Sequence, residues 1–95
     1  MLAKAPDREV IEVLSRIHGI GVWSAQMILI FTLGRSDVFA PKDGGIRQAM
    51  VSLYNLTKTG ASLEREMTNI AQNWKPECTT AMRLLWKYKD AELHK

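Results

Sequence analysis

The chain has 95 residues, of which 46% are hydrophobic and 24% are charged, and its formal net charge is +3. This composition is typical of one small globular domain and excludes a disordered chain. No apolar run approaches the roughly 20 residues of a membrane span, and the first residues lack the pattern of a secretory signal. We therefore expect no membrane partner.

Two helices separated by a glycine turn are predicted at the start of the chain. The first runs from about residue 7 to 17, because its apolar residues recur at helical spacing. The residues HGIG at 18–21 interrupt it, since two glycines in three residues favour a tight turn. The second helix, 22–33, is apolar on most sides, which predicts a central place in the fold.

Three further helices are expected after this pair. An irregular connection containing Pro41 leads to a helix at 43–54, whose predicted inward residues are Ile46, Met50 and Leu53. Ser62 is the expected N-cap of a fourth helix, and Pro76 is expected in the first turn of a fifth that ends near residue 93. The prediction is a single all-α domain over 1–95, with its parts at about 7–33, 34–54 and 62–93.

The end of the chain carries one cysteine and several cations. A single cysteine, Cys78, excludes an intramolecular disulfide and a multi-cysteine zinc site, and it favours a reducing compartment. Nothing adjacent in the sequence would activate its thiol, so we expect it to be inert. The basic residues of the last helix are expected to form a solvated face that complements the helix dipole: Arg83, Lys87, Lys89 and Lys95.

The glycine turn has a chemical use of its own. Glycine lets a backbone approach a surface closely, and the free N–H groups at the start of the second helix carry the positive end of its dipole. This arrangement suits a nucleic-acid phosphate. The alternative is a helical hairpin whose glycines only permit the chain to reverse.

A longer stretch of sequence resembles a known family. The residues LSRIHGIGVWSAQ at 14–26 resemble the helix-hairpin-helix of the DNA glycosylase superfamily, and the resemblance continues through 33–39, 43–47 and 74–86. The branch they resemble is that of alkylated bases, the 3-methyladenine DNA glycosylase II type. The resemblance implies the C-terminal half of a helical catalytic domain, a helix-hairpin-helix followed by about three further helices.

In that family the hairpin binds the backbone of double-stranded DNA beside an alkylated base. The positions that the resemblance implies for DNA binding are His18, Gly19, Ile20, Gly21, Trp23 and Ser24. His18 stands where proline is common, so it is either a further phosphate contact or an exposed turn residue. Family hairpins often hold Na⁺ or K⁺ on main-chain carbonyls, here those of Ile17 and Ile20, and no other cofactor is implied.

Asp43 matches the catalytic aspartate of the family. It opens the predicted helix at 43–54, so it is also a candidate N-cap, and both roles can hold together. A helix N-terminus favours the charged carboxylate. Such a carboxylate can stabilise an oxocarbenium-like sugar or orient the attacking water. Trp23 occupies the place of the Schiff-base lysine of bifunctional members, which implies a monofunctional enzyme.

Aromatic residues are expected around the flipped base. Trp23, Met27 and Trp86 resemble pocket residues of this branch, where an electron-poor alkylated base gains from stacking on an indole. The alternative for the two tryptophans is ordinary core packing. For Phe31 and Trp74 we predict the core. Cys78 departs from the family, which commonly has arginine at that position.

The implied function is base-excision repair of alkylated purines such as 3-methyladenine by hydrolysis of the N-glycosidic bond. The alternative is a non-enzymatic DNA-binding module or an inactive fragment, because the family's first helical half would precede residue 1. The compartment would be the cytoplasm and nucleoid of a prokaryote or the nucleus of a eukaryote. A missing half or a second copy is expected to cover the apolar helix at 22–33 through Met27, Ile30 and Phe31.

Overall fold

The computed structural model describes residues 5–93, which form five α-helices. These are α1 (Asp7–Ser15), α2 (Val22–Phe31), α3 (Gly44–Tyr54), α4 (Gly60–Ala71) and α5 (Cys78–Tyr88), with a 3₁₀ turn at Gln72–Trp74 and a π-helical turn at Lys89–Leu93. No strand occurs between residues 5 and 93, which confirms the predicted all-α class. In the same range, no helix is long and apolar enough to cross a membrane.

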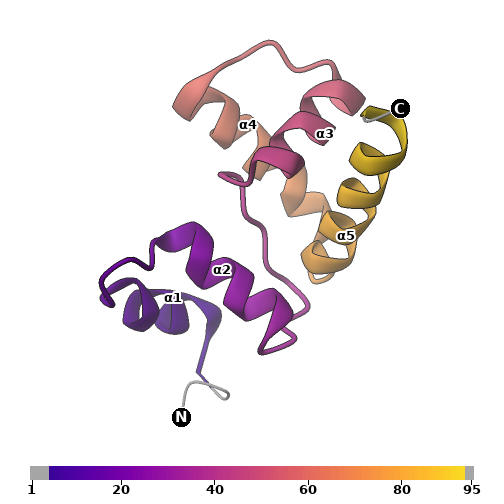
Figure 1. Cartoon of the computed structure of the whole chain (residues 1–95). Coiled ribbons are helices and arrows are strands. Elements are labelled where there is room, and N and C mark those ends of the chain that lie inside the picture. The colour runs from indigo at the N-terminus through magenta and orange to yellow at the C-terminus, as the bar shows by residue number, and fades with distance from the viewer. Residues whose placement is uncertain (1–4, 94–95) are drawn as a thin grey trace.

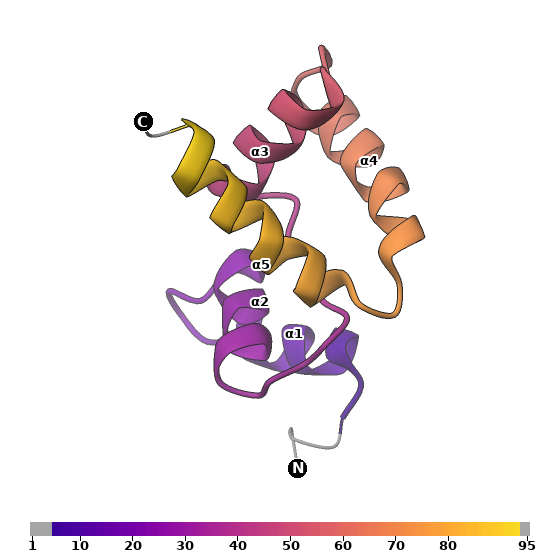
Figure 2. The same cartoon turned by 90° about the vertical axis from the view of Figure 1, so that its right-hand side faces the viewer.

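The helices form two groups that share one core. Helices α1 and α2 pack together as a hairpin, and α3 packs on α5 (Figure 1). Seen from the side, α5 lies over α2 and beside α3 (Figure 2). The fully buried side chains come from both groups and from α4, and they include Val10, Leu29, Ile30, Ile46, Met50, Met67 and Met82. The hairpin is therefore part of the hydrophobic core.

The hairpin turn is built as its glycines predict. Helix α1 ends at Ser15, two residues before the predicted end, and the Ile20 N–H closes the turn by donating to the Ile17 carbonyl at 3.0 Å. Gly19 has a φ of 88°, in the left-handed region that favours glycine. Gly21 is extended and directly precedes α2. Because glycine has no side chain, the first N–H groups of α2 receive no side-chain cap from it.

The later helices begin and end differently from the prediction. Leu53 was expected to face inward but is 47% exposed, because the last turn of α3 extends beyond the core and residues 52–55 are all exposed. Ser62 does not cap α4, which already begins at Gly60 after Thr59. Pro76 precedes α5, because Lys75 before it is extended, as residues preceding proline usually are.

The connection between α2 and α3 is held by Thr79 of α5. The Thr79 hydroxyl donates to the Arg35 carbonyl at 2.8 Å and accepts the Val38 N–H at 3.0 Å, while the Thr79 N–H donates to the Ser36 carbonyl at 3.0 Å. The Thr79 side chain thus pairs two backbone groups of this connection, the Arg35 carbonyl and the N–H of buried Val38. This anchoring fixes the path by which the chain enters α3.

Two further hydrogen bonds and an ion pair join the connection to the helices. The Asp37 carboxylate accepts the N–H of Cys78, the first residue of α5, at 3.2 Å, and so caps that helix from a distant part of the chain. The Gln26 amide donates to the Phe39 carbonyl at 3.1 Å. Arg35 forms an ion pair with Asp7 at 2.6 Å, which ties the same connection to the start of α1.

We predict that Thr79→Val destabilises the protein by about 1–3 kcal/mol, because the buried Val38 N–H loses its acceptor while side-chain volume is kept. Urea denaturation followed by circular dichroism measures this change. Thr80→Val, at the exposed next residue, is the matched control and should change the free energy of unfolding by less than about 0.5 kcal/mol. Equal midpoints for the two variants would contradict the anchoring role of Thr79.

Candidate active site

Asp43 lies where the connection enters α3, and its carboxylate accepts hydrogen bonds from three elements. Oδ2 accepts the backbone N–H of Ile46 at 3.0 Å, which makes Asp43 the N-cap of α3. Oδ1 accepts the indole N–H of Trp23 from α2 at 2.9 Å, and Oδ2 also accepts that of Trp86 from α5 at 2.9 Å. The carboxyl therefore joins α2, α3 and α5 at one point.

The environment of Asp43 favours the ionised carboxylate. Asp43 is only 9% exposed, and burial by itself raises the pKa of its carboxyl. The hydrogen bonds from Trp86, Ile46 and Trp23 act in the opposite direction and outweigh burial, so the pKa is lowered from its ordinary value of 3.8. The structure thus holds a negative charge in a largely apolar setting at neutral pH.

Trp23 and Trp86 are neither fully buried nor free in solvent. Trp23 is 44% exposed although its N–H is bonded to Asp43, and Trp86 is half-buried. Met27, one turn after Trp23, is half-buried against the core. Both indoles direct their single N–H at the same carboxylate. The sequence indicates a pocket or a core role for each tryptophan but does not indicate this shared role.

Phe31 does not belong to the core, contrary to the prediction. It is 60% exposed because it ends α2, and its ring stacks on that of Trp86 with the centroids 5.7 Å apart. The guanidinium of Arg83 lies 5.2 Å from the centroid of the Phe31 ring. Trp74 is half-buried and meets Phe39 edge to face, as a residue packed against the core.

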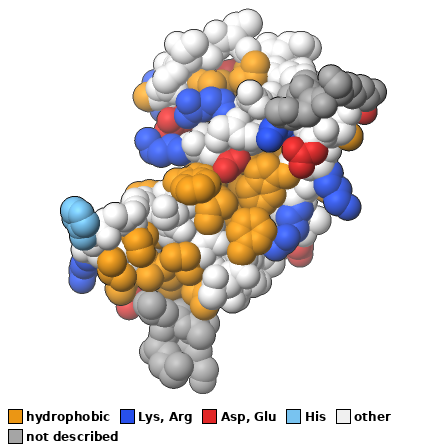
Figure 3. All heavy atoms as spheres, viewed as in Figure 1, with side chains coloured by type: hydrophobic (Ala, Val, Ile, Leu, Met, Phe, Trp, Pro, Cys, Tyr) orange, Lys and Arg blue, Asp and Glu red, His pale blue; other side chains and the backbone are white. Residues whose placement is uncertain are grey.

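Apolar side chains are exposed on the hairpin, whose Trp23 donates to this carboxylate. Figure 3 shows hydrophobic side chains gathered over the hairpin and over its junction with the other helices. The exposed hydrophobic residues of α1, α2 and the turn are Val13, Ile17, Val22, Trp23 and Phe31. Ile30 is not among them: it is fully buried in the core, so its predicted place in a contact with a second copy is wrong.

The hairpin turn presents its backbone to solvent. His18, Gly19 and Gly21 are exposed, whereas Ile20 and Ser24 are half-buried. A methyl group added at Gly21 would meet no atom within 4 Å, so open space lies in front of the start of α2. The turn and Asp43 are connected through α2, which begins at the turn and carries Trp23 in its first turn.

The remaining predicted features lie apart from Asp43. Cys78 is buried, and its pKa is raised to about 11, first by burial and then by the neighbouring Asp37, so the thiol is inert as expected. Lys87 is exposed and Lys89 pairs with Asp90 at 3.5 Å; Lys95 lies outside the described residues.

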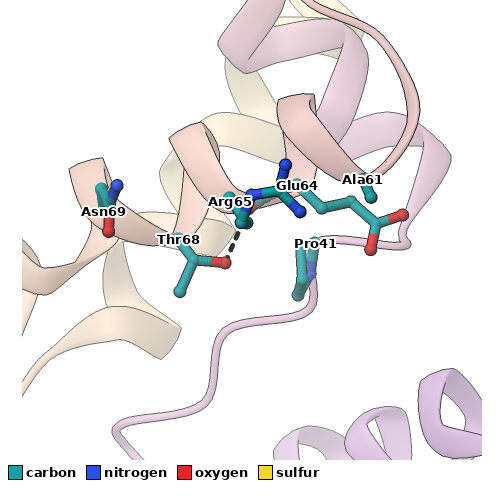
Figure 4. A pocket seen from close by; sticks show the side chains of 6 residues that line it. All are labelled: Pro41, Ala61, Glu64, Arg65, Thr68 and Asn69. Carbon is teal, nitrogen blue, oxygen red and sulfur yellow. Dashed lines mark hydrogen bonds between the residues drawn. The ribbon is translucent and has the colours of Figure 1, made fainter.

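A hollow of about 380 Å³ lies beside α4 (Figure 4). The residues that line it include Glu64, Arg65 and Thr68, and none of its lining residues is bonded to Asp43.

The fold and the site define a helical-hairpin protein that holds an ionised carboxylate among aromatic side chains. The chain is 40% identical over 91 residues to the DNA-3-methyladenine glycosylase of Saccharomyces cerevisiae, across 95% of this chain and 30% of that protein. It is 36% identical over 81 residues to DNA-3-methyladenine glycosylase 1 of Schizosaccharomyces pombe, across 85% of this chain and 35% of that protein. No family profile matches the chain.

A third relative extends the similarity to a protein with a different name. The alkylbase DNA glycosidase-like protein mag2 of Schizosaccharomyces pombe is 29% identical over 86 residues, across 90% of this chain and 39% of that protein. Over the residues that it shares with these proteins, the chain is homologous to proteins named DNA-3-methyladenine glycosylase. It spans between 30% and 39% of the length of these relatives.

We predict that the lowered pKa of Asp43 makes part of the stability depend on pH. A lowered pKa in the folded state contributes stability that is present above the unfolded pKa of 3.8 and is lost as the pH falls through the folded value. The free energy of unfolding of the wild type should therefore fall more steeply below about pH 4 than that of Asp43→Asn. Urea denaturation from about pH 6 to about pH 2 measures both. Parallel curves would contradict an ionised, bonded Asp43.

Proposed function

We propose that this chain provides the DNA-gripping hairpin and the catalytic carboxylate of a monofunctional DNA glycosylase that removes alkylated purines such as 3-methyladenine. The observation that carries the proposal is the Asp43 carboxylate, held ionised by two indole N–H groups and the start of α3. The names of the relatives support alkylated DNA as the substrate and do not favour a non-enzymatic module. With DNA as the partner, the proposed compartment is the cytoplasm and nucleoid of a prokaryote or the nucleus of a eukaryote.

The proposed reaction breaks the bond between C1′ of the deoxyribose and the purine nitrogen. The bonding electrons leave with the alkylated base, whose positive charge they neutralise, and the sugar becomes an oxocarbenium-like cation. Asp43 stabilises that cation through its negative charge, because two opposite charges attract each other more strongly in an apolar setting than in water. Water then adds to C1′ through its oxygen and releases one proton to the solvent. A carboxylate of low pKa is a weak base, which favours electrostatic stabilisation over proton abstraction.

The base would be bound beside the tryptophans. Trp23 is partly exposed and Trp86 half-buried, so both rings remain near the surface while their N–H groups point at Asp43. An alkylated purine cation stacks favourably on an electron-rich indole. Half-buried Met27, one turn from Trp23, is proposed to line the same wall. Base, sugar cation and carboxylate would then lie within one small region.

The DNA backbone would meet the hairpin turn. The exposed backbone at Gly19 and Gly21 and the uncapped start of α2 suit a phosphate, with His18, Ile20, Trp23 and Ser24 beside it. The Ile17 carbonyl uses one acceptor position for the Ile20 N–H, and a carbonyl oxygen has two. This carbonyl and that of Ile20 are the proposed ligands of a Na⁺ or K⁺ ion at the turn.

The exposed apolar surface of the hairpin is proposed to be covered by further chain or by a second copy. Ile30 is excluded from that contact, since it already lies in the core. The apolar side chains that remain for it are Val13, Ile17, Val22 and Phe31. Self-association therefore stays a prediction, with a smaller contact surface than the sequence indicated.

We predict that Asp43→Asn reduces release of 3-methyladenine from alkylated duplex DNA by about 10²–10³-fold, because a neutral amide does not stabilise a developing cation. Chromatography of the released base measures the rate. Asp90→Asn, an exposed carboxylate of the π-helical turn, is the matched control and should keep the wild-type rate. Equal release by Asp43→Asn and wild type would remove Asp43 from the mechanism, and duplex binding without release would favour the DNA-binding module.

A second prediction concerns the hairpin. Gly21→Ala should weaken duplex DNA binding, because its methyl group blocks close approach of a phosphate to the start of α2. The backbone at Gly21 (φ −92°, ψ −175°) suits alanine, so the melting temperature should be kept or raised. Fluorescence anisotropy at several salt concentrations measures affinity and its salt dependence. Unchanged affinity with a normal melting temperature would place the phosphate contact elsewhere.

A further inference from the structure

Phe31 is an exposed aromatic residue at an unusual place. It ends α2, three-fifths of its surface is exposed, and one face of its ring lies against Trp86 at a 25° angle. Arg83 precedes Trp86 by one helical turn on α5, and its guanidinium lies over the Phe31 ring. Two residues of α5 therefore hold one side chain of α2. Because this contact buries little of Phe31, core packing does not explain it.

A second constraint on the position of Trp86 comes from α3. A Cβ atom at Gly45 would lie 3.2 Å from Cδ1 of Trp86 and 3.3 Å from Oδ2 of Asp43, closer than most real contacts of that atom. Cδ1 is bonded to Nε1, the atom that donates to Asp43. The donating edge of the indole thus fits against α3 because residue 45 has no side chain, while Phe31 lies against its ring.

We propose that Phe31 and Arg83 are positioning residues, which hold the Trp86 indole in the orientation where its N–H donates to the Asp43 carboxylate. A hydrogen bond weakens steeply when its angle departs from linearity, so an indole that can rotate serves the carboxylate less well. The stacked ring restricts that rotation, and the cation holds the stacked ring in place. This inference deepens the proposed function and rests on it for the effect on catalysis.

Both ends of α2 make contacts that lead to the Asp43 carboxylate. Trp23, in its first turn, donates directly to Asp43, whereas Phe31, its last residue, acts through Trp86. The two indole N–H groups that converge on the carboxylate thus both depend on α2. A change at residue 31 should disturb the Trp86 bond and leave the Trp23 bond in place.

Nuclear magnetic resonance of the 95-residue chain tests the positioning role without any substrate. In Phe31→Ala the indole N–H resonance of Trp86 should shift toward that of a free indole, the Trp23 resonance should stay, and Asp43 should titrate at a higher pH than in the wild type. Phe31→Tyr keeps the stacked ring and should restore both signals. Leu84→Ala removes a 62% exposed apolar side chain of α5 that helical spacing places on the side away from Trp86; it is the matched control and should change neither.

Base release provides the second readout. Phe31→Ala and Arg83→Ala should lower the rate constant for release of 3-methyladenine by about two- to tenfold, the effect of weakening one hydrogen bond, and Phe31→Tyr should restore it. Unchanged Trp86 and Asp43 signals in Phe31→Ala would overturn the positioning role. Changed signals with a wild-type rate would overturn its effect on catalysis. A wild type that releases no base would contradict the proposed function instead, while the resonance measurements still decide the orientation of Trp86.

Discussion

The structure depends on one buried negative charge and the groups that stabilise it. A carboxylate removed from water is costly unless hydrogen bonds replace its hydration, and Asp43 obtains them from the first turn of α3 and from the indoles of Trp23 and Trp86. These three donors lie on three different helices. Pairing of this charge therefore requires α2 and α5 to approach the start of α3. Because α2 is half of the hairpin, the same bonds orient the hairpin.

The connection between α2 and α3 is ordered by the same requirement that buried polar groups be paired. Thr79 forms hydrogen bonds to the Arg35 carbonyl and the Val38 N–H of this connection. Asp37 caps α5, whose own N-cap residue supplies no side-chain bond. Such long-range caps make an irregular segment as well defined as a helix. Asp43 follows this segment directly, so its carboxylate is held in place as the proposed role at a reacting sugar requires.

The apolar surface beside the site fits a protein whose relatives are much longer. Phe31, Trp23 and Val22 are exposed on α2, the helix whose Trp23 donates to Asp43, and the proposed stacked base or further protein would bury them. Since the chain spans at most 39% of the length of the relatives described above, contacts from other parts of such a protein are a reasonable source of that burial. The surface and the site would then be completed together.

The sequence by itself determined the helical class, the glycine turn, the role of Asp43 as a helix cap and the inert character of Cys78, because each depends on local spacing or residue chemistry. It misplaced Leu53, Ser62, Pro76, Phe31 and Ile30, whose positions depend on where neighbouring elements end. Only the tertiary structure decided that both indoles donate to one carboxylate and that Phe31 lies outside the core. Those contacts join residues 20 to 55 positions apart, a separation at which no periodic pattern indicates which side chains will meet.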